Sequence, residues 1–97
     1  MKDFQQMKDF FSAIPDDPRL GAYHISLYMS LYHHWLLSDC KEPMQINRRD
    51  IMKTAKISGI ATYHRCIREL HNYGYIRYMP SYNPVCSTKV FMINNKV

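Results

Sequence analysis

The chain has 97 residues, which is enough for one domain with a buried core. Apolar residues make up 46% of it and aromatic residues 13%, so its composition excludes the intrinsically disordered class. It contains no run of about 18 apolar residues and no secretory leader pattern, so we expect a cytoplasmic protein that does not enter a membrane.

The net charge of +5 is unevenly distributed. Residues 1–44 hold four Lys or Arg against six Asp or Glu, whereas residues 45–97 hold nine against two. The second part therefore carries a positive field that attracts an anionic polymer. A basic surface that only aids solubility would give the same counts of basic and acidic residues. We expect one compact domain, with helices for packing and dimerisation in residues 1–44 and the functional part in residues 45–97.

A first amphipathic helix is predicted over residues 3–14. Its apolar residues recur at helical spacing and share one side: Phe4, Met7, Phe11 and Ile14. The segment Pro15-Asp16-Asp17-Pro18 ends this helix, because proline cannot continue it.

A longer helix is predicted over residues 19–38, and it has two apolar stripes. One contains Leu20, Tyr23, Leu27, Leu31 and Trp35, and the other contains Ile25, Met29, Tyr32 and Leu36. A helix that is apolar on two sides must bury both, and a second copy of the chain is an economical partner for one of them. We therefore predict a homodimer through residues 19–38. In the alternative, the first helix covers the second stripe within one monomer.

Residues 39–47 form a connector with a short strand over residues 44–46. Asn47 is a helix N-cap residue, and Asp50 stands three positions later, so a short helix is predicted from residue 48 with Ile51 and Ala55 buried. Residues 56–59 then form a turn in which Ile57 fills the angle with the next helix. Two short helices joined in this way make a helix–turn–helix.

The segment from Ser58 to Gly74 predicts one complete helix. Ser58 is a candidate N-cap, and Gly74 suits the left-handed turn after the last helical residue. The predicted buried face contains Ile60, Tyr63, Ile67 and Leu70. The opposite face carries polar and cationic side chains: Thr62, His64, Arg65, Arg68 and Asn72.

Residues 75–79 and 88–93 are rich in β-branched and aromatic residues, and a proline-containing turn separates them. These segments predict a β-hairpin with a long tip. The expected fold class is mainly α with a small β-hairpin (α+β).

Helix, turn, helix and hairpin in this order resemble the winged helix-turn-helix family. The resemblance is strongest over Tyr63-His-Arg-Cys-Ile-Arg-Glu-Leu-His-Asn-Tyr-Gly-Tyr-Ile-Arg77. In this family a Leu stands four residues before a Gly, and an apolar pair then opens the first wing strand, as do Leu70, Gly74, Tyr75 and Ile76 here. Arg48-Arg-Asp-Ile-Met52, residues 70–76 and Pro80-Ser-Tyr-Asn-Pro84 are similar to small winged-helix regulators of bacterial mobile elements.

The resemblance implies a sequence-specific protein that binds duplex DNA, either as a transcriptional regulator or as an accessory factor of a mobile element. Its recognition helix would lie in the major groove, with Thr62 and His64 near base edges and Arg65 and Arg68 on bases or phosphates. Further candidate DNA-binding residues are Arg48, Arg49, Lys53 and Lys56, and, in the wing, Tyr82, Asn83 and Lys89. In the alternative, Arg68 forms a solvated charged face with Glu69 or Asp50.

Other chemistries find less support in the sequence. Five His and three Cys lack the spacing of a metal site, so no metal or other cofactor is expected. Nothing assembles a nucleophile, a base and an oxyanion site, so we do not expect an enzyme. The remaining alternative is a winged-helix protein-protein interaction module of a replication or recombination complex. An RNA-binding role would also use a basic wing, but no aromatic platform for bases is identified.

Overall fold

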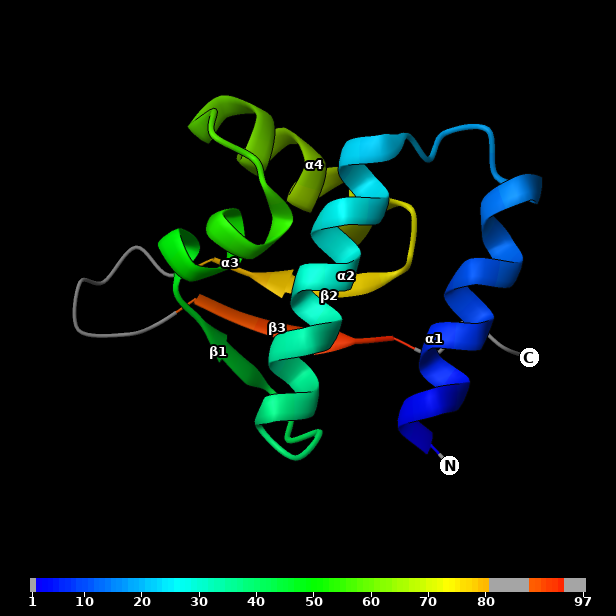
Figure 1. The fold of residues 1–97 in the computed structure, drawn as a ribbon, viewed down its shortest axis with the longest axis horizontal. Helices are drawn as coiled ribbons and strands as arrows, with labels where there is room; N and C mark the ends of the chain where they lie inside the picture. The colour runs from blue at the N-terminus through cyan, green and yellow to red at the C-terminus, as the bar shows by residue number, and fades with distance from the viewer. Residues whose placement is uncertain (1, 81–87, 94–97) are drawn as a thin grey trace.

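The computed structural model describes residues 2–80 and 88–93. Within them the elements follow in the order α1 (Lys2–Ala13), η1 (Ile14–Asp16), α2 (Ala22–Leu37), β1 (Met44–Ile46), α3 (Arg48–Ala55), α4 (Ile60–Asn72), β2 (Ile76–Met79) and β3 (Thr88–Met92), as Figure 1 shows. The protein is mainly helical with a small antiparallel sheet, which confirms the predicted α+β class. None of the helices in the described residues has the length and apolar character needed to cross a bilayer.

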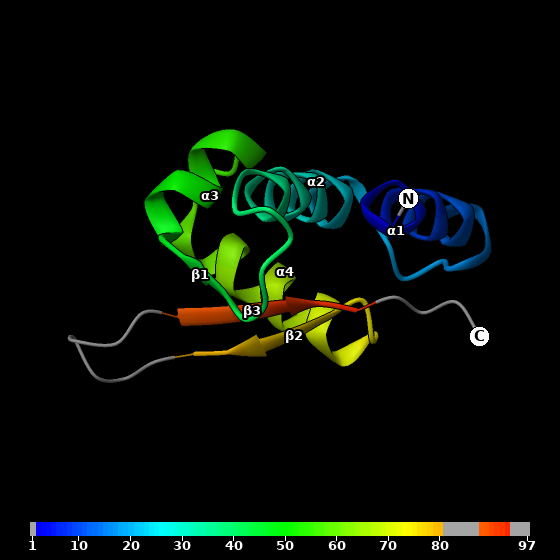
Figure 2. The ribbon, with the colours of Figure 1, turned by 90° about the horizontal axis from the view of Figure 1, so that it is seen from below.

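The sheet has the strand order β1-β3-β2, and both neighbouring pairs are antiparallel. Met44 of β1 pairs with Val90, and Ile76 of β2 pairs with Met92. The two strands of the predicted hairpin are therefore extended to a three-stranded sheet by β1, the short strand that precedes α3. Figure 2 shows α1 and α2 in one layer and the strands in another.

One hydrophobic cluster connects both parts of the chain. It draws large side chains from α1, α2, α3 and α4 and from the sheet: Phe10, Leu27, Leu31, Trp35, Ile51, Ile67, Leu70, Ile76 and Val90. α2 packs against both α3 and α4. The boundary near residue 44 thus separates two regions of opposite charge that share a core.

The buried side of α1 differs from the predicted one. Phe4 and Phe11 are 51% and 45% exposed, whereas Phe10 is buried and its ring stacks on Tyr28 of α2 at 3.7 Å between centroids. Beside it, buried Gln6 donates from Nε2 to Tyr28 Oη and to the Ile93 carbonyl, both at 2.8 Å. An apolar pattern cannot reveal this face, because one of its central residues is a hydrogen-bonded amide.

α2 begins at Ala22, three residues after the predicted start at residue 19. Two serines on one side of the helix bind α3: Ser30 Oγ donates to the Ile51 carbonyl at 2.9 Å, and Ser26 Oγ donates to the Ala55 carbonyl. These bonds fix the crossing of α2 over the first helix of the helix–turn–helix.

α3 begins as predicted. The Asn47 side chain accepts from the backbone N–H groups of Arg49 at 2.9 Å and Asp50 at 3.4 Å, so it caps the helix. Ile51 and Ala55 are buried, and so is Ile57 in the turn over residues 56–59 that leads to α4. The predicted helix–turn–helix connection is therefore confirmed.

α4 ends as predicted but begins differently. Gly74 has φ 92°, its N–H binds the His71 carbonyl, and the Tyr75 N–H binds the Leu70 carbonyl, which is a Schellman motif. At the other end Gly59, rather than Ser58, is the N-cap, and no side chain caps the helix. Ile60 is also 48% exposed instead of buried. It lies in the first turn, where Ile57 already fills the angle with α3.

Candidate nucleic-acid interface

α4 presents a cationic outer face to solvent. Tyr63, Cys66, Ile67 and Leu70 are buried on the inner face. Arg65 and Arg68 are exposed on the outer one, and Thr62 and His64 are half-buried. Thr62 and His64 lie about 200° apart around the helix axis, so they flank the arginines on opposite sides. The structure therefore gathers the four predicted residues on one arc with the arginines at its centre.

α3 and the following turn carry the second group of predicted cations. They line an open groove of about 520 Å³, here called the α3 groove, formed by Arg48, Arg49, Met52, Lys53, Lys56, Ile57, Ser58 and Ile60. Its floor is apolar, and its four cations are exposed. The groove begins at α3 and reaches the first residue of α4.

A second hollow, of about 410 Å³, lies between α4 and the sheet. It is more polar than the α3 groove and is lined by Ile46, Asn47, Arg48, Arg49, Tyr63, His64, Tyr78 and Thr88. Arg48 and Arg49 line both hollows. They join the surface of α3 to the side of α4 that carries His64.

The cations of this surface are not neutralised by neighbouring acids. Within residues 2–80 and 88–93, Arg48, Arg49, Lys53, Lys56 and Arg68 form no ion pair. Among these residues Arg68 pairs with neither Glu69 nor Asp50, and its side chain is exposed, so the alternative of a solvated charged face stays a prediction. Glu69 instead binds Arg65, whose Nη1 is 3.1 Å from its Oε1. Five unpaired cations on adjoining helices make a surface that suits an anionic partner.

The predicted wing residues are only partly described. Lys89 lies on β3, where it pairs with Gln45 of β1 and Met79 of β2, and its side chain is half-buried. Tyr82 and Asn83 lie outside the described residues. Arg77 on β2 is exposed, and its guanidinium lies 5.7 Å from the centroid of the Phe91 ring.

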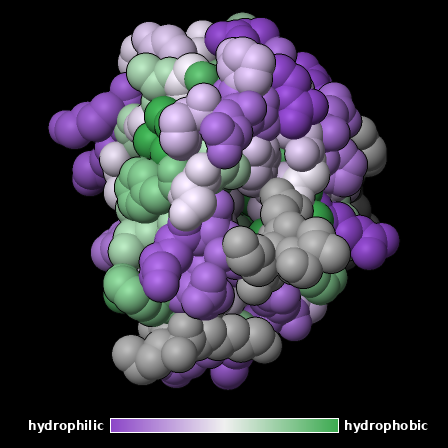
Figure 3. Space-filling model, turned by 90° about the vertical axis from the view of Figure 1, so that its right-hand side faces the viewer, coloured by the Kyte–Doolittle hydropathy of each residue, from purple (hydrophilic) through white to green (hydrophobic). Residues whose placement is uncertain are grey.

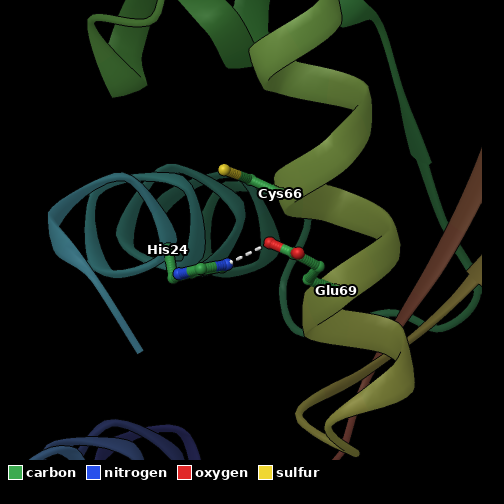
Figure 4. A group of neighbouring side chains, drawn as sticks. All are labelled: His24, Cys66 and Glu69. Atoms are coloured by element: carbon green, nitrogen blue, oxygen red, sulfur yellow. Dashed lines mark hydrogen bonds and ion pairs between the residues drawn. The ribbon is translucent and has the colours of Figure 1, made fainter. Parts of the chain in front are cut away.

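A partly buried contact ties α4 to the start of α2 (Figure 4). His24 Nδ1 accepts from the Gly21 backbone N–H at 2.9 Å, so the hydrogen of the neutral ring is on Nε2. Nε2 then donates to Glu69 Oε1 at 2.7 Å. The same oxygen accepts from Arg65, so His24 and Arg65 meet on one carboxylate.

Cys66 lies close to this contact, and the ligand atoms of His24, Cys66 and Glu69 are all within 4.8 Å of one another. These three residue types bind zinc elsewhere. Here, however, both imidazole nitrogens are engaged in hydrogen bonds, and neither keeps a free lone pair for a metal. Burial also raises the pKa of the Cys66 thiol, which disfavours the thiolate that zinc requires. The geometry fits an interhelical hydrogen bond better than a metal centre.

A second polar contact holds the α1–α2 connection against the end of α4. Asp17 accepts from Arg19 Nε and Nη2, both at 2.8 Å, and from Tyr75 Oη at 2.6 Å. The Arg19 guanidinium also lies 4.2 Å from the centroid of the Tyr73 ring. The hydrogen bonds from Arg19, followed by the one from Tyr75, hold the pKa of Asp17 well below its usual 3.8.

This contact predicts a pH-dependent stability. Because the pKa of Asp17 is lower in the folded state, its contribution is present above pH 3.8 and is lost as the pH falls through the folded value. Asp17→Asn should lower the urea midpoint of unfolding at pH 7, and the difference from wild type should shrink on acidification. Asp16→Asn, at an exposed neighbouring position, is the control and should leave the midpoint unchanged. A difference that widens in acid would contradict the assignment.

Comparisons of the chain with protein-family models, with curated proteins and with solved structures found no match. The candidate interface therefore rests on its own residues. Sequence reasoning missed the exposure of Ile60 and the positions of Asn47, Tyr78 and Thr88 at the second hollow. Asn47 was identifiable as a cap, but only the folded structure brings it to one hollow with Tyr78 of β2 and Thr88 of β3.

Proposed function

We propose that the protein is a winged helix–turn–helix that binds duplex DNA sequence-specifically, with α4 as its recognition helix and β2 and β3 as its wing. A role as a transcriptional regulator or as an accessory factor of a mobile element follows from the family resemblance. The order of α3, a four-residue turn, α4 and two antiparallel strands supports the proposal.

The shape of the surface also supports DNA as the ligand. A recognition helix meets base edges with the residues of its outer face, while flanking elements bind phosphates. α4 offers two exposed arginines at a spacing of three, and α3 offers further cations beside them. A guanidinium can bind a phosphate or both O6 and N7 of a guanine.

The observation that carries the proposal is a set of five cations on α3, the turn and α4 that form no ion pair within residues 2–80 and 88–93. A basic surface kept only for solubility would mix both signs of charge. Here the acids of the C-terminal part are few, and Glu69 faces His24 and Arg65.

Fluorescence anisotropy with a labelled mixed-sequence duplex tests the proposal. We expect roughly micromolar non-specific binding that weakens steeply between about 50 and 200 mM salt. Four neutralised phosphates would give a log–log slope of about −4. Absence of binding at the lowest salt concentration would refute the proposal. If binding is observed, selection from a random duplex pool should yield a preferred site.

Lys53→Ala should weaken binding to all duplex sequences alike. Lys53 is an exposed lysine of α3 without an ion-pair partner in the described part of the chain, and we assign it to a backbone phosphate. Its loss should make the salt slope shallower by about one unit. Lys41→Ala removes an exposed lysine from the acidic part of the chain and should change neither quantity. A loss confined to one DNA sequence would instead indicate base contact.

We also propose that the protein forms a homodimer through residues 19–38. Several apolar side chains on one side of α2 remain accessible, since Ile25 and Met29 are half-buried and Leu36 is exposed. Apolar surface is also visible along one edge of the molecule viewed from the α1 side (Figure 3). A dimer with two-fold symmetry would present two recognition helices, one to each half-site of the DNA.

Sedimentation equilibrium should give a mass near twice the 11.6 kDa of the chain. Met29→Glu with Leu36→Glu should give the monomer mass, because two buried charges would oppose the interface. Leu37→Glu is the matched control, since this leucine lies next in sequence but about 100° around the helix. A wild-type protein that stays monomeric at all concentrations tested would exclude the dimer without affecting the DNA proposal.

A further inference from the structure

The α3 groove combines an apolar floor with a cationic rim. Met52, which is half-buried, and Ile60, which is 48% exposed, supply the accessible apolar side chains, whereas Ile57 is buried. The volume of about 520 Å³ falls within the range of ligand sites. An isoleucine with this exposure at the first position of a helix, facing a groove, is a candidate contact residue.

The rim of the groove carries charges of one sign. Arg48, Arg49, Lys53 and Lys56 line it, none of its lining residues is acidic, and none of these cations is in an ion pair within the described residues. Phosphates alone would use these charges but leave the apolar floor uncovered. The groove therefore fits a ligand that is both anionic and apolar.

The form of the groove limits this ligand further. A small molecule is usually held in a site that buries most of its surface, whereas this groove lies open along α3 and the turn. α3 has eight residues and is therefore about 12 Å long, which matches about two turns of a helix laid beside it. Apolar residues at i, i+3 or i+4, and i+7 of such a helix would lie on one face.

We propose that the α3 groove binds an acidic amphipathic helix of a partner protein. Its apolar residues contact Met52 and Ile60, and its carboxylates pair with the four cations of the rim. Because the proposed DNA surface uses the same cations, the helix and duplex DNA compete. This competition rests on the proposed function, whereas peptide binding itself does not.

A designed peptide tests the proposal on the full chain. The probe is a fluorescein-labelled 16-residue peptide of glutamate and alanine with leucines at positions 4, 7, 11 and 14. Its control has the same composition, with the leucines distributed around the helix. We expect the amphipathic peptide to bind at least about tenfold more tightly than the control, because only it can bury its leucines together. Equal affinities would overturn the proposal, since charge alone would then explain binding.

Ile60→Ser should weaken binding of the amphipathic peptide about tenfold and leave the control peptide unaffected. Leu37→Ser is the matched variant, since Leu37 is 69% exposed and lies outside the groove, and it should bind like wild type. The circular dichroism spectrum and thermal midpoint of each variant report whether the fold is kept. Full peptide affinity of a folded Ile60→Ser variant would refute the groove as the binding site.

The same series separates this inference from the proposed function. If the duplex binds and the amphipathic peptide does not, the inference fails and the DNA proposal stands. If the peptide binds and the duplex does not, the groove is a protein-binding site and the DNA proposal fails. If both bind, unlabelled peptide should displace labelled duplex. Simultaneous binding would show that peptide and duplex do not use the same cations, and the proposed competition would be wrong.

Discussion

Replacing Arg65 and Arg68 together by alanine is expected to abolish selective DNA binding while leaving the fold intact. Both side chains are exposed on the outer face of α4, so neither supports the core. A well-placed guanidinium contributes about 1–3 kcal/mol of discrimination at a base pair. The loss of both arginines should therefore cost about 2 kcal/mol or more of binding free energy, which is roughly 30-fold in affinity for the preferred site.

The measurement compares anisotropy titrations with the selected duplex and with a mixed-sequence duplex. Arg77→Ala is the matched control, because this exposed arginine lies on β2 against the Phe91 ring rather than on α4. It should keep the preference for the selected site. Unchanged selectivity in the double variant would remove α4 from the role of recognition helix, even if the protein still bound DNA through α3.

Phe10→Ala should cause a large loss of stability. The Phe10 ring is buried, stacks on Tyr28 at 3.7 Å and meets Tyr75 edge-on at 5.4 Å between centroids. Truncation of a buried phenylalanine costs about 3–5 kcal/mol, a large share of the stability of a small domain. We expect a markedly lower urea midpoint, together with weaker protection of the α1 amides in hydrogen exchange.

Phe4→Ala and Phe11→Ala are the matched controls on the same helix. Both rings are largely exposed, so each change should alter the free energy of unfolding by about 0.5 kcal/mol or less. A cost at Phe4 equal to that at Phe10 would mean that α1 packs through the face predicted from its apolar spacing.

Local signals in the sequence predicted the helix–turn–helix well. Asn47 is a cap, Gly74 takes a positive φ, and Ile51 and Ala55 are buried, since each depends on nearby backbone geometry or on one helix face. The failures concern tertiary packing. The face of α1 is set by the Gln6 amide and Phe10, which find partners 18 or more residues away.

The candidate interface was predictable in composition but not in organisation. Charge asymmetry and helical spacing located Arg65, Arg68 and the cations of α3. Whether a cation is paired depends on folded geometry, and the pairing of Glu69 with His24, 45 residues earlier in the chain, could not be inferred from spacing. The apolar floor of the α3 groove was hidden for a similar reason, because Ile60 fits the periodicity of a buried residue.

The hydrogen bond from Gln6 to the Ile93 carbonyl joins positions 87 residues apart, and β1 likewise pairs with β3 near the far end of the chain. During synthesis the first helix therefore emerges long before the strand end that completes its packing. The nascent chain can form α2, α3 and α4 locally, but the Gln6 amide of α1 lacks one of its two acceptors until Ile93 has been made. We expect cooperative folding only once β3 has emerged from the ribosome, so a chain that ends at residue 80 should lack a sharp unfolding transition.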